Sequence, residues 1–292
     1  MSEAKAYSPA SLSLIFKACL PAKHSLAMRA GPNKDPFKMG SIGVGCTIDR
    51  GVTVSVRDST KTQVLFNGKS IKFPTVDSVI KALSPKTVII SIKSSLPLGF
   101  GFGLSGASAL AAAYALNKLF GFKKGRQDLA KIAHQAEITN STGLGSVGTQ
   151  ITGGFLVKNS PGIPVTNAVS LSFIGKKLFV TIIDRLPTPT ILKNKKLLPK
   201  INKAADNALK QIGKGKHLGL GEIIDIAFYF ALNSTVLSDP LIISIISNIK
   251  KSGGHATMAM LGQVVISDIK PKLGKNFRIE ELTITNDIAA LL

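Results

Sequence analysis

The stretch PLGFGFGLSGASAL, residues 97–110, places glycine at positions 99, 101, 103 and 106 and runs directly into an alanine-rich segment. Glycine loses more backbone freedom on folding than any other residue, so an ordered segment keeps it only for a conformational or steric reason. Here the missing Cβ atoms would let backbone N–H groups approach a ligand closely. Residues 105–121 predict a helix closed by Gly121, and its first turn would direct free amides and the positive dipole end at that ligand. The stretch therefore predicts an anion site, above all for phosphate.

Three other interpretations of these glycines compete with a phosphate site. Residues 101–106 match the G-x-G-x-x-G dinucleotide fingerprint, but Asp128, at the spacing of the expected acidic residue, lies in a predicted helix rather than at a strand end. A P-loop at residues 68–70 (GKS) fails because position 63 is Gln63 instead of glycine. A merely tight turn explains one or two glycines, but not four in this register.

Strands and helices are mixed along the chain without strict alternation, which predicts an α+β fold in two domains. The β-branched alternation of residues 43–58 predicts a hairpin, and residues 86–97 predict a strand that leads into the glycine segment. Residues 141–157 predict a glycine-rich turn followed by a strand. Other helices are expected at 126–140, 197–213, 220–235 and 239–252, and other strands at 176–184 and within 256–269. The boundary is placed in residues 158–165, giving domains 1–162 and 163–292.

The composition is strongly basic, with 37 Lys and Arg against 16 Asp and Glu, a net charge of +21. Such a surface attracts nucleic acid, anionic membranes or small anions. Aromatic residues make up only 6% of the chain, so bases would find few stacking platforms, and we do not expect a nucleic-acid partner.

We expect a cytoplasmic protein without a membrane segment. The uncharged residues 94–117 are interrupted by Pro97 and glycines, and Lys17 interrupts the N-terminal apolar stretch. Cys19 and Cys46 have no metal-ligand spacing and are expected to be reduced thiols.

Four stretches in order make the chain similar to the GHMP small-molecule kinases and, within them, to the archaeal pantoate kinases. They are the glycine segment, DPFKMGSIGVGCTIDRGV at 35–52, AHQAEITNSTGLGSVGTQITGG at 133–154 and ATMAMLGQVVIS at 256–267; SPAS at 8–11 resembles the family start. The resemblance implies an N-terminal domain like part of ribosomal protein S5 and a ferredoxin-like C-terminal domain. It implies transfer of the ATP γ-phosphoryl group to the 4-hydroxyl of pantoate, in coenzyme A biosynthesis, with Mg²⁺.

The resemblance also implies roles for individual residues. Ser105 and Glu137 would contact Mg²⁺, which prefers oxygen ligands and usually takes only one or two protein groups. The ATP-binding residues would be Pro97, Gly99, Gly101, Gly103, Leu104, Ser105, Gly106, Ala107 and Ser108. The substrate-binding residues would be Lys38, Gly40, Ser41, Gly43, Thr142, Gly143 and Gly145, with Lys38 as a candidate for a carboxylate and residues 40–43 as a turn.

The chain departs from the family pattern at two positions. Ser146 stands where related kinases usually have Asp, and Ser11 stands in place of an expected His. A serine is no carboxylate base at neutral pH. Phosphoryl transfer depends mainly on alignment and charge neutralisation, so Ser146 and Glu137 stay the catalytic candidates. His134 is expected to pack or orient, and Met260 and Leu261 to pack.

The two departures leave two alternatives open. One is another GHMP kinase, acting on mevalonate, shikimate or homoserine. The other is a catalytically silent binding protein of the same fold. A homodimer is an open alternative to a monomer.

Overall fold

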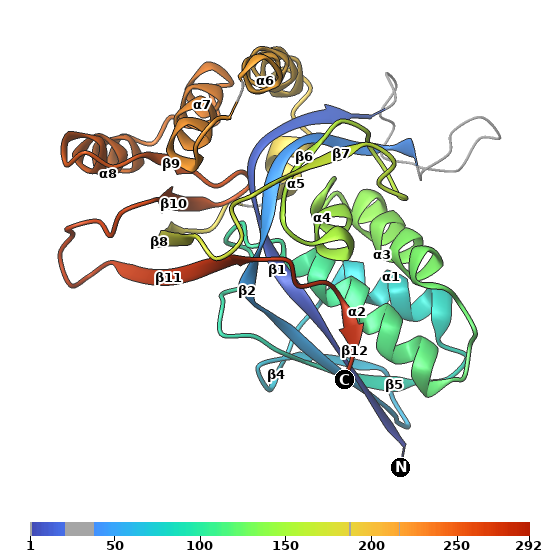
Figure 1. Ribbon diagram of the computed structural model, residues 1–292. Coiled ribbons are helices and arrows are strands. Elements are labelled where there is room, and N and C mark those ends of the chain that lie inside the picture. Colours follow the sequence, from blue (N-terminus) through green and yellow to red (C-terminus); the bar gives the residue numbers. More distant parts are fainter. Residues whose placement is uncertain (1, 21–37, 187, 216) are drawn as a thin grey trace.

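The computed structural model describes residues 2–20, 38–186, 188–215 and 217–292. Its centre is a long antiparallel pair of strands, β1 (Glu3–Cys19) and β2 (Gly40–Asp58), which crosses the whole molecule (Figure 1). The two strands pair from Glu3 opposite Arg57 to Cys19 opposite Gly40. This pair and the segments beside it carry most of the residues around the candidate site.

The other elements follow in chain order. The other strands are β3 (Gln63–Phe66), β4 (Lys69–Ser70), β5 (Val88–Lys93), β6 (Phe155–Lys158), β7 (Ala168–Leu171), β8 (Lys177–Asp184), β9 (Ala256–Met258), β10 (Gln263–Ser267), β11 (Arg278–Thr285) and β12 (Ala290–Leu291). The helices are α1 (Pro74–Leu83), α2 (Leu104–Leu119), α3 (Arg126–Asn140), α4 (Ser146–Thr152), α5 (Thr188–Leu192), α6 (Leu197–Lys214), α7 (Leu220–Asn233) and α8 (Pro240–Lys251).

Within the described residues the strands join into one sheet of order β4-β3-β5-β2-β11-β8-β10-β9. Strands β1 and β6 also pair with β2, and they carry β12 and β7, respectively, as their other neighbours. The connection between the two halves is short, because only Ile284 and Thr285 of β11 pair with β2. Helices α1 to α4 gather on one side of the β1–β2 pair, and α6 to α8 lie with β8 to β10 at the other end (Figure 1).

Helix α2 forms the centre of the first half because its residues are small and apolar on every side. All residues from Gly106 to Leu116 are buried, and no residue of its first turn is acidic. A helix that is apolar all round has to be enclosed by other elements. Here α1, α3, α4 and the β1–β2 pair enclose it, which fixes its N-terminus inside the protein.

The predicted hairpin at 43–58 is wrong, because these residues belong to the single strand β2. Gly51 allows β1 to approach β2 closely, since a Cβ at this position would lie 2.3 Å from the carbonyl oxygen of Ser8. The irregularity that suggested a turn is a bulge: Pro9 pairs with Gly51, whereas Ser11 pairs with Thr47. The turn expected at residues 40–43 is wrong for the same reason, as β2 begins at Gly40.

The remaining predicted helices and strands are observed, whereas several observed elements, among them α1, α5 and β11, were not predicted. The predicted helices correspond to α2, α3, α6, α7 and α8, and the strand before the glycine segment is β5. The turn predicted at 141–154 contains a short helix, α4. The boundary between residues 162 and 163 stays a prediction; it falls between β6 and β7, which pair with one another. No helix of the described residues is long and apolar enough to cross a membrane.

Candidate functional site

The glycine segment forms the predicted loop between β5 and α2. Gly99, Gly101 and Gly103 have φ angles of 90°, 85° and 63°, a backbone region that residues with a side chain rarely adopt. Gly103 is the N-cap of α2, and no side chain caps this helix. The N–H groups of its first turn are therefore left to a ligand at the positive end of the helix dipole.

Neighbouring segments press on this loop so closely that two of its glycines have no room for a Cβ. A Cβ on Gly103 would lie 2.3 Å from the Ser11 Oγ, and one on Gly101 would lie 3.0 Å from the Cα of Gly262. The Gln150 amide, on α4, donates to the Gly103 carbonyl (2.8 Å) and to Ser11 Oγ (3.2 Å). The stretch 256–267, which contains Gly262, thus contacts the loop. Gln150 supports the loop from α4, and the sequence motifs did not single it out.

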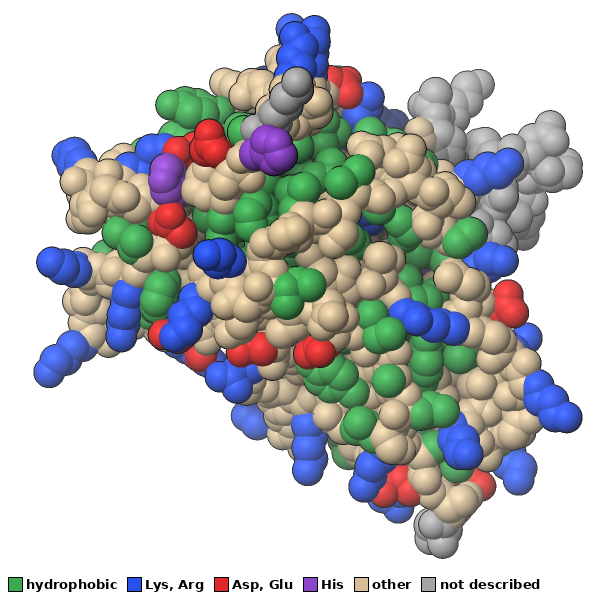
Figure 2. Space-filling view, in the orientation of Figure 1, with side chains coloured by type: hydrophobic (Ala, Val, Ile, Leu, Met, Phe, Trp, Pro, Cys, Tyr) green, Lys and Arg blue, Asp and Glu red, His purple; other side chains and the backbone are tan. Residues whose placement is uncertain are grey.

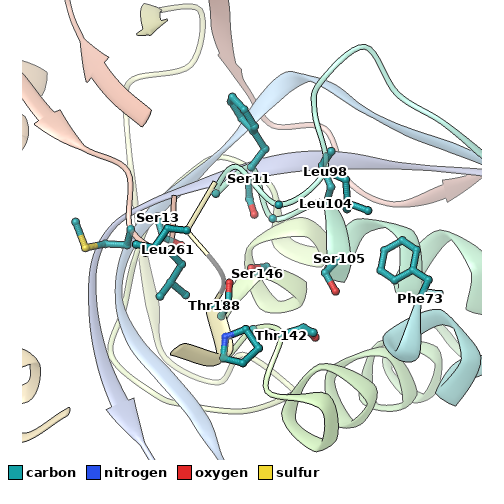
Figure 3. A pocket seen from close by; sticks show the side chains of 18 residues that line it. Ser11, Ser13, Phe73, Leu98, Leu104, Ser105, Thr142, Ser146, Thr188 and Leu261 are labelled. Carbon is teal, nitrogen blue, oxygen red and sulfur yellow. The ribbon is translucent and has the colours of Figure 1, made fainter. Parts of the chain in front are cut away.

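A cavity of about 250 Å³ opens beside the loop. Figure 3 shows the side chains of Ser11, Ser105, Thr142 and Ser146 around it, together with Thr188 and Leu261 from the second half of the chain. The full lining is Ser11, Ser13, Phe73, Leu98, Gly99, Gly101, Phe102, Gly103, Leu104, Ser105, Thr142, Gly143, Ser146, Leu186, Thr188, Pro189, Met260 and Leu261. All polar side chains of this lining are the hydroxyls of serine and threonine.

Glu137 is a buried carboxylate next to this cavity. It is 1% exposed, and its Oε2 has no hydrogen-bond partner among the described residues. Burial raises the pKa of Glu137 to about 7, although hydrogen bonding from Ser105 and Thr142 and the charge of Lys158 act in the opposite direction. Gly143 and Gly106 give the carboxylate its space, since a Cβ on them would lie 2.3 and 2.8 Å from Oε2.

These residues fit a divalent cation of the magnesium type. An orphaned carboxylate oxygen in a dry site is stabilised by a cation, and the Ser105 hydroxyl is a neutral oxygen ligand close by. Within the described ranges no three His, Cys, Asp or Glu side chains gather into a metal cage. A metal bound at Ser105 and Glu137 would therefore complete its shell with water and phosphate oxygens, as Mg²⁺ usually does.

Lys158, at the end of β6, is a buried cation that the sequence motifs did not reveal. It is 7% exposed, and its Nζ donates to the carbonyl oxygen of Gly145 over 2.8 Å. Burial lowers the pKa of Lys158 to about 8, against the opposing charges of Cys19 and Glu137. An ammonium group has three donors, and this carbonyl is the one acceptor found for it in the described parts of the chain. The other two N–H donors of Lys158 and its positive charge are therefore available to bind an anion.

His134 packs and orients, as expected, rather than carrying a charge. Its Nε2 lies 2.8 Å from the carbonyl oxygen of Met39, so this nitrogen must hold the proton, because a carbonyl only accepts. Burial lowers the pKa of His134 to about 4. The ring also lies 3.3 Å from where a Cβ on Gly40 would stand, and it thereby fixes the start of β2 beside α3.

The predicted site residues divide into three groups by position. Those that line the cavity are Gly99, Gly101, Gly103, Leu104, Ser105, Thr142, Gly143 and Ser146. Those one layer behind it are Gly106 and Glu137, which touch one another, and Ser41 and Gly145, which form a second contact group with the unpredicted Lys158. Ala107 and Ser108 are buried inside α2, Pro97 precedes the cavity lining, Gly40 and Gly43 lie in β2, and Lys38 is exposed.

Two lining residues differ from expectation. Met260 and Leu261, expected only to pack, line the cavity, and the backbone N–H of Met260 donates to the carbonyl of Ser13. Ser11 and Ser146, which replace the family's usual His and Asp, both face the cavity. The two departures from the family pattern therefore lie at the site.

Known proteins resemble this chain in sequence and in fold. Residues 73–154 match the family of GHMP kinases N terminal domains. The pantoate kinase of Methanocaldococcus jannaschii is 30% identical to this chain over 237 residues, which are 80% of this chain and 85% of that protein. The chain belongs to the pantoate kinase family. The pantoate kinase of Methanospirillum hungatei is 27% identical over 236 residues, which are 78% of this chain and 78% of that protein.

A solved structure supports the fold of this pantoate kinase family member. A protein described as a phosphotransferase related to the CoA biosynthesis pathway has a TM-score of 0.81, with 99% of this chain and 98% of that chain covered. Its sequence identity is 23%, so the likeness concerns the fold. The expected α+β fold of GHMP kinases is confirmed.

Proposed function

We propose that this protein transfers the γ-phosphoryl group of ATP to the 4-hydroxyl of pantoate, giving 4-phosphopantoate for coenzyme A biosynthesis. The observation that carries the proposal is one cavity lined by a phosphate-type loop, with two buried charges, Glu137 and Lys158, one layer behind its lining. Membership of the pantoate kinase family supports the choice of acceptor. We keep the cytoplasmic location and a homodimer as predictions.

The glycine loop is suited to hold the triphosphate. Its three left-handed glycines expose backbone amides, and the uncapped N-terminus of α2 adds its dipole. Phosphoryl transfer gains mostly from alignment and charge neutralisation. Bound at Ser105 and Glu137, Mg²⁺ would neutralise phosphate charge. Burial of Glu137 serves that binding, because a carboxylate without a partner attracts a cation strongly in a dry site.

The contact group of Ser41, Gly145 and Lys158 is suited to the acceptor. Pantoate carries a carboxylate, and a buried ammonium with free donors forms strong charge-assisted hydrogen bonds to such a group. Lys158 therefore replaces the exposed Lys38 as our candidate for the carboxylate. Because Lys158 bonds to the carbonyl of Gly145, the residue before Ser146, a carboxylate held there would place the rest of the acceptor toward the cavity.

The proposal is tested by ADP release from the purified protein with Mg-ATP. D-pantoate is compared with mevalonate, shikimate and homoserine, each at the same concentration and with an acceptor-free control. We expect turnover that depends on pantoate and is abolished in Ser105→Ala and Glu137→Gln. Turnover with another acceptor alone would move the assignment to another GHMP kinase. ATP binding with no turnover would favour the silent binding protein.

A further inference from the structure

The hydroxyl of Thr75 joins three segments behind the candidate metal site. Thr75 lies in the first turn of α1 and is 0% exposed. The Ser105 Oγ donates to Thr75 Oγ1 over 3.0 Å, and Thr75 Oγ1 lies 2.9 Å from Thr142 Oγ1. The Thr142 hydroxyl in turn donates to the backbone carbonyl of Glu137 (3.5 Å). Ser105 and Thr142 face the cavity, whereas Thr75 is not among its lining residues (Figure 3).

The number of protons gives this chain of hydroxyls a direction. Each hydroxyl has one proton and two lone pairs. The Ser105 hydroxyl donates to Thr75 and the Thr142 hydroxyl donates to the Glu137 carbonyl, so the hydrogen bond between Thr75 and Thr142 uses the proton of Thr75. All three protons then point away from the Ser105 oxygen along the chain. The lone pairs of that oxygen are left for a ligand.

A second acceptor competes for the Ser105 proton. Ser105 and Thr142 are both near enough to the Glu137 carboxylate to affect its ionisation by hydrogen bonding. Yet Oε2 of Glu137 has no hydrogen-bond partner among the described residues, and the Ser105 hydroxyl donates to Thr75 instead. Without an acceptor at Thr75, Ser105 would donate to the carboxylate, and the two candidate metal ligands would be bonded to each other.

We propose that Thr75 is a positioning residue. It accepts the hydrogen bond of the Ser105 hydroxyl, so that Ser105 and Glu137 both present lone pairs to a divalent cation. The inference rests on the proposed function, because it assigns Thr75 to the metal-dependent half of nucleotide binding. Thr75 does not line the cavity, and it reaches the nucleotide-binding segment through its hydrogen bond with Ser105. Loss of one such bond corresponds to roughly a tenfold change in an equilibrium constant.

The test compares Thr75→Val, which keeps the shape and removes the hydroxyl, with Thr75→Ser, which keeps the hydroxyl. Thr257→Val is the matched control, because Thr257 is equally buried, lies in β9 and has a hydroxyl with no hydrogen-bond partner in the described part of the chain. Titration calorimetry measures ADP binding with EDTA and again with saturating Mg²⁺. In Thr75→Val the gain in ADP affinity on adding Mg²⁺ should be roughly tenfold smaller than in the wild type. The affinity for ADP measured in EDTA should stay unchanged. Thr75→Ser and Thr257→Val should retain the wild-type increment.

A wild-type Mg²⁺ increment in Thr75→Val would overturn the proposal, and so would an equal loss with and without metal. Circular dichroism and the melting temperature check that each variant is folded. If Thr75→Val does not fold, Thr142→Val takes its place, since it removes the acceptor that Thr75 needs for its own proton. It should then show a smaller loss in the same metal-dependent step, and no loss would overturn the proposal. Binding of ADP needs no acceptor, so a wild-type protein without pantoate turnover would refute the proposed function and leave this test intact.

Discussion

Lys158 Nζ and the carbonyl oxygen of Gly145 lie 2.8 Å apart, joining the end of β6 to the residue that precedes α4. The contact places a buried cation directly behind Ser146, and no other Lys or Arg of the described residues is buried. On the face drawn in Figure 2, Lys and Arg side chains are scattered over the outer surface. A Cβ on Gly145 would lie 2.9 Å from this Nζ and 2.4 Å from Ser41 Oγ. The absence of a side chain at Gly145 is therefore what admits the ammonium to the site.

The first prediction concerns Lys158→Met, which keeps the length of the side chain and removes its charge. The KM for pantoate should rise by roughly 10- to 100-fold, because a hydrogen bond to a charged group is worth about 1.5–3 kcal/mol. The KM for ATP should change little. Lys38→Met serves as the control, since Lys38 is exposed and should leave both constants unchanged. Initial rates over a matrix of pantoate and ATP concentrations separate the two constants, and a rise confined to the ATP constant would contradict the assignment.

The second prediction is that Glu137→Gln abolishes turnover and yet stabilises the metal-free protein above neutral pH. Burial raises the pKa of Glu137 from 4.5 to about 7, so the folded state binds more protons than the unfolded state between these values. Stability from this group is therefore present below pH 4.5 and is lost as pH rises toward 7. This difference in the pKa of Glu137 between the folded and unfolded states corresponds to on the order of 3 kcal/mol in the free energy of unfolding.

Urea unfolding of wild type and Glu137→Gln in EDTA measures this difference. At pH 8 the variant should have the higher free energy of unfolding, and at pH 4.5 the advantage should shrink. Added MgADP should stabilise the wild type more than the variant, since Gln has no charge to offer a cation. An advantage that does not depend on pH would show that the carboxylate is not buried as an unpaired charge.

The sequence was sufficient to predict the loop, because the loop and the helix after it are neighbours along the chain. Its glycines are there because the backbone adopts positive φ angles at Gly99, Gly101 and Gly103. It also identified Ser105, Thr142, Gly143 and Glu137, which belong to motifs close to one another along the chain. Lys158 and Gln150 stand among apolar or small residues, and their roles arise only when β6 and α4 fold beside β1 and the loop. The supposed hairpin failed because a glycine that permits close approach to Ser8 has the same sequence signature as a glycine in a turn.

The third prediction concerns acid. Burial lowers the pKa of His134 from 6.5 to about 4, so the unfolded state binds more protons between these values. Stability from this group is complete above pH 6.5 and decreases as pH falls toward 4, by on the order of 3 kcal/mol. In His134→Gln this loss should disappear, because a glutamine amide can donate to the Met39 carbonyl without titrating. Unfolding of both proteins at pH 5 and pH 7 in EDTA isolates the effect, as Glu137 titrates identically in each; parallel losses in the two proteins would contradict it.

The fourth prediction addresses the serine that stands in place of the family's usual aspartate. Ser146 lines the cavity at the start of α4, but its hydroxyl is no base at neutral pH. If alignment by the loop, Glu137 and Lys158 carries the transfer, Ser146→Ala should lower kcat by less than about tenfold, the value of one neutral hydrogen bond. Glu137→Gln and Ser105→Ala, measured beside it, should lose far more. The slope of kcat against pH is the second readout: wild type and Ser146→Ala should have the same profile. A loss of 100-fold or more in Ser146→Ala, which is the range of general-base catalysis, would mean that this hydroxyl takes part in moving the acceptor proton.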